Sequence, residues 1–175
     1  MKPNIGISDK NREVVIKILN TILADEYVLY TKTRKYHWNV VGPQFNDLHK
    51  FFEAQYEALD EIVDEVAERA RSLGGTAFGT LSEFTNHTRL KEESGKNPDA
   101  EGMISRLLTD HESIIQNLRA GLEDSADKYG DMGTSDFLTG LMEKHEKMAW
   151  MLRSFVWRSV KEATFASSSS SQSSS

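Results

Sequence analysis

Side chains that bind metal ions recur at helical intervals in the first half of this 175-residue chain. His49 and Glu53 are four residues apart, and so are Asp64 and Glu68, so each pair shares one face of a helix. The 11 residues from Glu53 to Asp64 make about three helical turns, which places all four side chains on one stripe. His37 precedes His49 across a short turn. Imidazole and carboxylate groups together suit Fe(II), Mn(II) or Zn(II), so the stripe predicts a metal site.

The length of this stripe prevents one ion from using all of it. From His49 to Asp64 is 15 residues, or about 22 Å along a helix. A second copy of the same helix, antiparallel across a two-fold axis, would bring Asp64 and Glu68 of one chain against His37 and His49 of another. The spacing therefore predicts two equivalent metal sites in a dimer, each shared between two subunits.

A plainer interpretation of the same residues stays open. Asp64 and Glu68 could form a solvated helix face, with Glu68 paired to Arg69 or Arg71, and His37 could be an ordinary residue at a helix end. The Glu-x-x-His motif of bundle-centred di-iron sites is absent, because none of the 5 histidines has Glu three residues earlier. We predict no functional role for the remaining histidines, His87, His111 and His145.

Four long helices are predicted to position these side chains. Apolar residues recur at steps of three, four and seven, as on the buried face of a helix. Ser8 or Asp9 can cap the first helix, and the Gly42-Pro43 pair must end it. The predicted helices run from 8 or 9 to before 41, from about 46 to 73, from about 99 to before 130, and from about 135 onward.

The connections between the predicted helices set their directions. Short turns join the first pair and the last pair, which should be antiparallel, whereas about 22 residues separate the second helix from the third. In that connection the apolar residues Phe78, Leu81 and Phe84 predict a short helix. The connection as a whole is long enough to travel the length of a bundle. An all-α, ferritin-like four-helix bundle with one long crossover is therefore expected over residues 9–163. The chain has only 3 prolines and 11 glycines, which disfavours an all-β fold of many turns.

The composition excludes several other classes of protein. Lys and Arg number 21 against 27 Asp and Glu, and the net charge of −6 disfavours a general binder of polyanions. The absence of cysteine excludes disulfide scaffolds, thiolate zinc sites and iron–sulfur clusters. No apolar run approaches the ~18–20 residues of a membrane span, and no signal peptide is visible. Residues 1–8 are predicted to form a short arm, and the serine-rich residues 164–175 a disordered tail.

A longer set of residues resembles one known family. The run Tyr-His-Trp-Asn-Val-Val-Gly-Pro-Gln-Phe at 36–45 is followed by a second histidine at 49, by Asp-Glu-Val-Ala-Glu-Arg at 64–69 and by Leu-Gly-Gly at 73–75. From about residue 10 to 160, the sequence resembles the Dps family, the DNA-binding proteins from starved cells, also called mini-ferritins. The joint spacing makes the resemblance specific, and it favours the metal site over the plainer interpretation.

The resemblance implies an assembly and a reaction. Members of the family are ferritin-like subunits assembled as hollow dodecamers, which oxidise Fe(II), usually with hydrogen peroxide, and store the ferric mineral inside. By position, His37 and His49 of one subunit, with Asp64 and Glu68 of its neighbour, would form the ferroxidase site and carry the catalysis. The resemblance also implies a cytoplasmic location, with association with the nucleoid left open, and no organic cofactor.

Other residues gain expected roles from the same resemblance. Glu53 stands where the family often has Asp, and its longer side chain can still ligate metal. Trp38 would lie beside the site, where the family places an aromatic residue that takes up oxidising equivalents. Asp127, Asp131 and Asp136 resemble a three-fold pore for iron entry. The alternative for these three residues is ordinary helix capping.

DNA binding is expected to be weak or absent. Many relatives use a lysine-rich N-terminal arm for DNA, and this chain offers only Lys2, Lys10 and Arg12 there. Three other hypotheses stay open: a DNA-compacting scaffold with little ferroxidase activity, a helical interaction module without metal, and a site of the same residues that takes Zn(II) or Mn(II).

Overall fold

The computed structural model describes the backbone of residues 3–170 and the side chains of residues 3–156. This part of the chain is helical and contains no strand. Its elements, in chain order, are α1 (Asp9–Asn39), α2 (Phe45–Ser72), α3 (Leu81–His87), α4 (Ala100–Glu123), the π-helical turn η1 (Asp124–Lys128) and α5 (Met132–Ser170). The all-α prediction is therefore confirmed.

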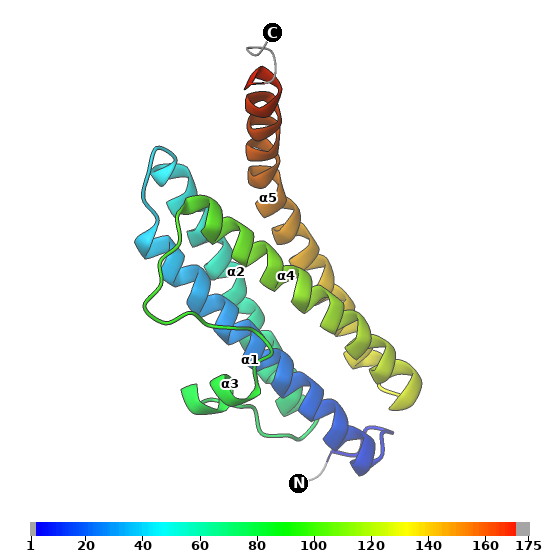
Figure 1. Cartoon of the computed structure of the whole chain (residues 1–175). Coiled ribbons are helices and arrows are strands. Elements are labelled where there is room, and N and C mark those ends of the chain that lie inside the picture. Colours follow the sequence, from blue (N-terminus) through cyan, green and yellow to red (C-terminus); the bar gives the residue numbers. More distant parts are fainter. Residues whose placement is uncertain (1–2, 171–175) are drawn as a thin grey trace.

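Two antiparallel helix pairs form the bundle (Figure 1). The 40–44 turn joins α1 to α2, and η1 with residues 129–131 joins α4 to α5. Between the pairs, residues 73–99 carry the short helix α3 and cross the face of α1 (Figure 1). As a result α2 and α4 run in the same direction, which is the ferritin-like arrangement that the long connection predicted.

Local sequence signals set the ends of the two helices that carry the predicted site. The side-chain oxygen of Ser8 caps α1 by accepting a backbone hydrogen bond. The turn after α1 contains Gly42 at φ 119°, a left-handed conformation that other residues rarely adopt. Gly74 follows α2 at φ 85° and supplies the left-handed residue that closes the helix. The turn at Gly42 thus brings the end of α1 beside the start of α2.

The apolar stripes of the four long helices meet in one continuous core. Buried residues recur at steps of three, four or seven along each helix, as the sequence pattern predicted. The following core side chains are at most 1% exposed: Leu19, Leu23, Leu29, Phe52, Leu59, Leu107, Ile114, Leu138 and Leu152. No described helix combines the length and the apolar character that crossing a membrane requires.

The helix boundaries differ from the predictions in the C-terminal half. α5 begins at Met132 rather than near 135, because Asp131 caps it by accepting from a backbone N–H at 2.9 Å. Before it, η1 adds a π-helical turn to the end of α4, which the periodicity did not predict. α5 continues to Ser170, and the disordered tail expected at 164–175 stays a prediction. Residues 171–175 lie outside the described residues.

Candidate metal centre

His37, in the last turn of α1, and His49, near the start of α2, hold each other through their backbones. The Nδ1 of His37 lies 2.8 Å from the carbonyl oxygen of His49, and the Nδ1 of His49 lies 2.9 Å from the carbonyl oxygen of His37. The two rings stack, with centroids 3.8 Å apart and planes inclined by 18°. We call this reciprocal arrangement the histidine clasp, and it orients both rings across the α1–α2 turn.

The histidine clasp decides which ring nitrogens are available to a metal ion. A carbonyl oxygen can only accept a hydrogen bond, so both Nδ1 atoms must carry a proton. In the neutral rings both Nε2 atoms then carry a lone pair, and neutral imidazole is the form that binds metals. The clasp therefore presents two adjacent, oriented ligand nitrogens.

Aromatic side chains surround the histidine clasp. Phe45 stacks on His49 with ring centroids 5.1 Å apart, and Tyr56 meets the ring of His37 edge-on at 5.2 Å. Partial burial, and after it the negative charge of Glu53, raises the pKa of Tyr56, so this phenol stays protonated at neutral pH. The rings are thus held by apolar contacts as well as by hydrogen bonds.

An exposed apolar patch lies beside the clasp. Trp38, Val41 and Phe45 are 65%, 75% and 46% exposed. The guanidinium carbon of Arg34 lies 5.4 Å from the centroid of the Trp38 ring, at cation–π distance. Large apolar side chains exposed together are typical of surfaces that bind another protein. This end of the subunit therefore has the character of an interface.

The three predicted carboxylate ligands lie along α2. Glu53 is half-buried, whereas Asp64 and Glu68 are exposed. Within the described part of the chain, none of these carboxylates takes part in an ion pair or a hydrogen bond. The alternative pairing of Glu68 is not formed, because Arg69 reaches the start of α5 and Arg71 reaches a backbone carbonyl. The carboxylates are therefore free to accept a ligand or a partner.

One chain does not bring the whole predicted site together. α2 is unbroken from Phe45 to Ser72, so His49 and Asp64 are about 22 Å apart along it. Among residues 3–156, no three His, Asp or Glu side chains lie close enough together to hold a metal ion. The fold thus joins the two histidines and leaves the distal carboxylates at the other end of the same stripe.

The three acidic residues of the predicted pore have different environments. Asp127 and Asp136 are exposed. Asp131 is only 2% exposed, because it caps α5 and forms an ion pair with Arg69 at 3.1 Å. The capping alternative therefore describes Asp131, whose carboxylate joins α2 to α5 inside the subunit.

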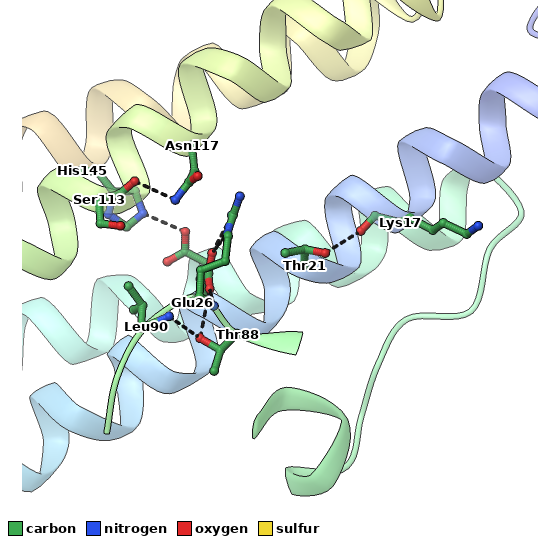
Figure 2. A network of polar contacts seen from close by, with 10 residues as sticks. Lys17, Thr21, Glu26, Thr88, Leu90, Ser113, Asn117 and His145 are labelled. Atoms are coloured by element: carbon green, nitrogen blue, oxygen red, sulfur yellow. Dashed lines mark hydrogen bonds and ion pairs between the residues drawn. The ribbon is translucent and has the colours of Figure 1, made fainter. Parts of the chain in front are cut away.

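A second histidine cluster lies inside the bundle, where the sequence predicted no role. The Nε2 of His145 lies 3.0 Å from a carboxylate oxygen of Glu26, and Figure 2 shows the imidazole directed at that carboxylate. The Nδ1 of His145 lies 2.9 Å from the Nδ1 of His111, and all three residues are 0% exposed. A sequence signal existed, because Leu107 and Leu141 lie four residues before the two histidines on the same buried stripes.

Burial sets the protonation of this inner cluster. Removal from water, and after it the charge of His145, lowers the pKa of His111 well below its usual value. His111 is therefore neutral at physiological pH. Its Nε2 has no hydrogen-bond partner among the described residues, and an unpaired polar atom in a core costs stability. The cluster is thus a point at which the bundle is sensitive to pH.

Comparison with known proteins decides the family. The family model for the ferritin-like domain matches residues 16–159. DNA protection during starvation protein 2 of Bacillus anthracis is 39% identical over 142 residues, which cover 81% of this chain and 96% of that protein. The chain belongs to the Dps family. An uncharacterized low temperature-induced protein of Nostoc sp. (strain PCC 7120) is 53% identical over 153 residues, which cover 87% of this Dps-family chain and 86% of that protein.

Solved Dps structures share the fold of this chain. The Dps protein of Vibrio cholerae superposes with a TM-score of 0.83 at 30% identity, and the match covers 89% of this chain and 96% of that one. Dps from Thermosynechococcus elongatus gives a TM-score of 0.79 at 33% identity, covering 84% and 92%. The Vibrio protein is described as a member of a broad superfamily of ferritin-like diiron-carboxylate proteins.

Proposed function

We propose that this Dps-family protein oxidises Fe(II) at sites shared between two subunits and stores the ferric product in a hollow dodecamer. The observation that carries the proposal is the histidine clasp, which presents two ligand nitrogens beside an exposed apolar patch. The carboxylates of Asp64 and Glu68, which have no partner among the described side chains, lie about 22 Å or more along α2 from His49. The histidines and the distal carboxylates are each an incomplete set of ligands at opposite ends of one stripe. A second subunit related by a two-fold axis would bring the histidines of one chain to the carboxylates of the other.

Each side chain has a role that its chemistry supports. His37 and His49 supply their Nε2 atoms as ligands, because the clasp keeps a proton on each Nδ1. The partner subunit's Asp64 and Glu68 supply charged oxygen ligands, which suit Fe(II) and hold Fe(III) more tightly. Glu53 lies four residues after His49 on the same face, so it can ligate iron from the histidine side.

Paired iron ions allow peroxide to be reduced without release of a radical. Each Fe(II) gives up one electron, and hydrogen peroxide accepts both, together with two protons, to form two water molecules. Trp38 follows His37 in the chain and is 65% exposed, so an oxidisable indole lies near the reaction to take up a stray one-electron equivalent. The Fe(III) product then hydrolyses and is held by acidic side chains, with Asp127 and Asp136 proposed at the iron-entry pore.

Protection of DNA is proposed to come from removal of iron and peroxide rather than from binding DNA. Arg12 is 6% exposed, bonds the carbonyl of Leu73 at 2.9 Å and pairs with Asp9, so it is committed within the subunit. Lys10 is exposed, and Lys2 lies outside the described residues. With so few cations available, the arm can neutralise only a few DNA phosphates, so DNA binding should be weak. An electrophoretic shift of DNA that persists at about 150 mM salt would contradict this expectation.

Anaerobic loading with Fe(II), followed by hydrogen peroxide, tests the proposed reaction. The double variant His37→Ala, His49→Ala should slow the initial rise in ferric absorbance at least about tenfold, since it removes both nitrogen ligands. His87→Ala changes an exposed histidine outside the stripe and should leave the rate unchanged. Wild-type kinetics in the double variant would remove the site assignment, and binding of Zn(II) without oxidation of Fe(II) would favour a redox-inactive site.

A further inference from the structure

A cavity of about 710 Å³ lies between α1, α4 and residues 89–95 of the crossover. The side chains that line it include Lys32, Tyr36 and Asp110, and none of them belongs to the proposed iron site. Its volume is in the range of sites that hold small molecules. The cavity is therefore a second candidate site on a different part of the subunit.

The crossover segment that roofs the cavity is anchored to α1 at both ends. At one end Asp25, which is 0% exposed, accepts hydrogen bonds from Arg89 through its backbone N–H at 2.6 Å, Nε at 2.8 Å and Nη2 at 2.5 Å. Figure 2 shows Thr88 and Leu90 of this segment lying against α1. At the other end the Nζ of Lys35 donates to the carbonyl of Lys96 at 2.8 Å. The roof is thus built into the fold, and the cavity is pre-formed.

The lining of the cavity is positive although the whole chain carries −6. The lining holds five basic and three acidic residues, and the buried Asp25 that pairs with Arg89 leaves a formal excess of 5 − 4 = +1: Lys32, Lys35, Arg89, Lys91 and Arg106 against Glu92, Glu93, Asp110 and Asp25. Two of the three lining carboxylates are already occupied, because Asp110 accepts from Lys32 at 2.5 Å and Glu93 pairs with Arg106. The lining therefore offers an excess of positive charge and few free acceptors.

Several hydrogen-bond donors in the lining are unused. Among the described residues, the hydroxyls of Ser94, Ser105 and Ser113 donate no hydrogen bond, and the ammonium of Lys91 has no ion pair. Lys32 donates to Asp110 and to a backbone carbonyl, which leaves one of its three N–H groups free. Unused donors in a positive cavity favour a ligand that is negative and rich in acceptors.

We propose that this cavity binds a small organic anion that carries a phosphate or carboxylate group. The anionic group would accept hydrogen bonds from Lys91, from the free N–H of Lys32 and from the serine hydroxyls. A bare phosphate would leave much of the 710 Å³ empty, so the remaining volume takes the organic part of the ligand. Removal from water raises the pKa of Asp110, against the opposing effect of its hydrogen bond from Lys32.

Calorimetric titration of the intact, iron-free protein at constant ionic strength tests the proposal. The probes are inorganic phosphate, glucose 6-phosphate and citrate, which separate a free phosphate from an organic phosphate and from a carboxylate ligand. We expect saturable binding, with at least one organic anion binding more tightly than inorganic phosphate. No saturable binding of any probe up to about 10 mM would overturn the proposal, and so would tighter binding of inorganic phosphate than of both organic anions.

Matched variants place the binding in this cavity. Lys91→Met with Ser105→Ala removes two unused donors and should weaken binding about tenfold. Lys147→Met with Ser154→Ala makes the same chemical changes on the exposed face of α5 and should leave affinity unchanged. Circular dichroism checks that both variants keep the helical fold. Equal affinities of the two double variants for the anion would overturn the assignment to this cavity. The single variant Ser113→Ala gives a second, independent test, since it should also weaken anion binding if the cavity is the site.

Discussion

At the scale of single residues, the group that each imidazole faces sets its chemistry. Backbone carbonyls hold the protons of His37 and His49 on Nδ1, whereas burial in the core keeps His111 neutral. The same residue type thus forms an oriented pair at the α1–α2 turn and an uncharged member of the core. Spacing in the sequence identified the first pair. It assigned no role to the inner pair, because a contact between His111 and His145 depends on how α4 packs against α5.

Acidification should destabilise the folded chain through His111. Its pKa in the fold is lowered below the ordinary 6.5, so below that pH the unfolded chain takes up a proton that the folded chain does not. The free energy of unfolding should therefore fall as pH drops below 6.5, by up to about 1.4 kcal/mol per pH unit from this group. Urea unfolding between about pH 5 and 7.5, at fixed protein concentration, measures the slope.

Two histidine variants separate the inner cluster from the rest of the chain. In the His111→Leu variant, the slope of the unfolding free energy against pH should fall by the amount that corresponds to about one proton taken up on unfolding. This change in slope is expected whatever the substitution does to stability at neutral pH. His87→Leu removes an exposed histidine and should leave the slope of the wild type. A wild-type slope in His111→Leu would show that the inner cluster does not govern the response to acid.

At the scale of helices, capping residues and glycines explain why the boundaries were largely predictable. Ser8 caps α1, and Asp99 caps α4 by accepting from a backbone N–H at 2.8 Å. Thr80 and Glu83 form a capping box that starts α3 within the crossover. The start of α5 was predicted too late, near 135, because the helical pattern of the sequence breaks between Gly130 and Ser135, whereas in the fold Asp131 caps the helix.

Asp131→Ala should lower the free energy of unfolding by about 2 kcal/mol, because it removes a helix cap and leaves a nearby guanidinium unpaired. Asp131 accepts hydrogen bonds from the Thr134 backbone N–H at 2.9 Å and hydroxyl at 2.6 Å, and it pairs with Arg69 at 3.1 Å. Asp136→Ala changes an exposed carboxylate of the same helix and should alter stability by less than about 0.5 kcal/mol. Urea unfolding compares the two, and equal losses would argue against the cap.

At the scale of the whole molecule, the iron site that we propose is incomplete within one subunit. Its histidine clasp lies beside the exposed Trp38, Val41 and Phe45, and the carboxylates that could complete the site lie at the far part of α2. Exposed apolar surface favours association with another subunit. In a dimer with a two-fold axis, the histidine end of each α2 would meet the carboxylate end of the other, which gives two equivalent sites. The proposed activity therefore requires assembly, and a mixture of two inactive variants can test this requirement.

Co-assembly of two inactive variants should restore activity if the iron site is shared. One variant carries His37→Ala with His49→Ala, and the other carries Asp64→Ala with Glu68→Ala. In a mixed dimer, the intact histidines of one chain meet the intact carboxylates of the other, so one of the two sites is complete. Ferric absorbance after Fe(II) and peroxide should therefore recover toward half of the wild-type rate in the mixed pairs.

Each variant assembled with itself supplies the control, because neither homodimer contains a complete site. Activity that stays at the level of the separate variants after co-assembly would contradict a shared site. Gel filtration of the wild type near the subunit mass of 19.8 kDa would contradict it as well, since a monomer holds no complete cluster within its described residues. The stability of both variants is checked by circular dichroism before mixing.

The amino-acid sequence by itself determined the helical class, the long crossover and the register of the stripe that we propose binds metal. These follow from periodicity and spacing, which are local properties, and the separation of His49 from Asp64 along a helix is a local length. Only the tertiary structure decided that each clasp histidine is held by the other's carbonyl, that Asp131 is a buried cap, and that the crossover roofs a positive cavity. These features join segments far apart in the chain, so their geometry depends on how the helices pack rather than on any one stretch of residues.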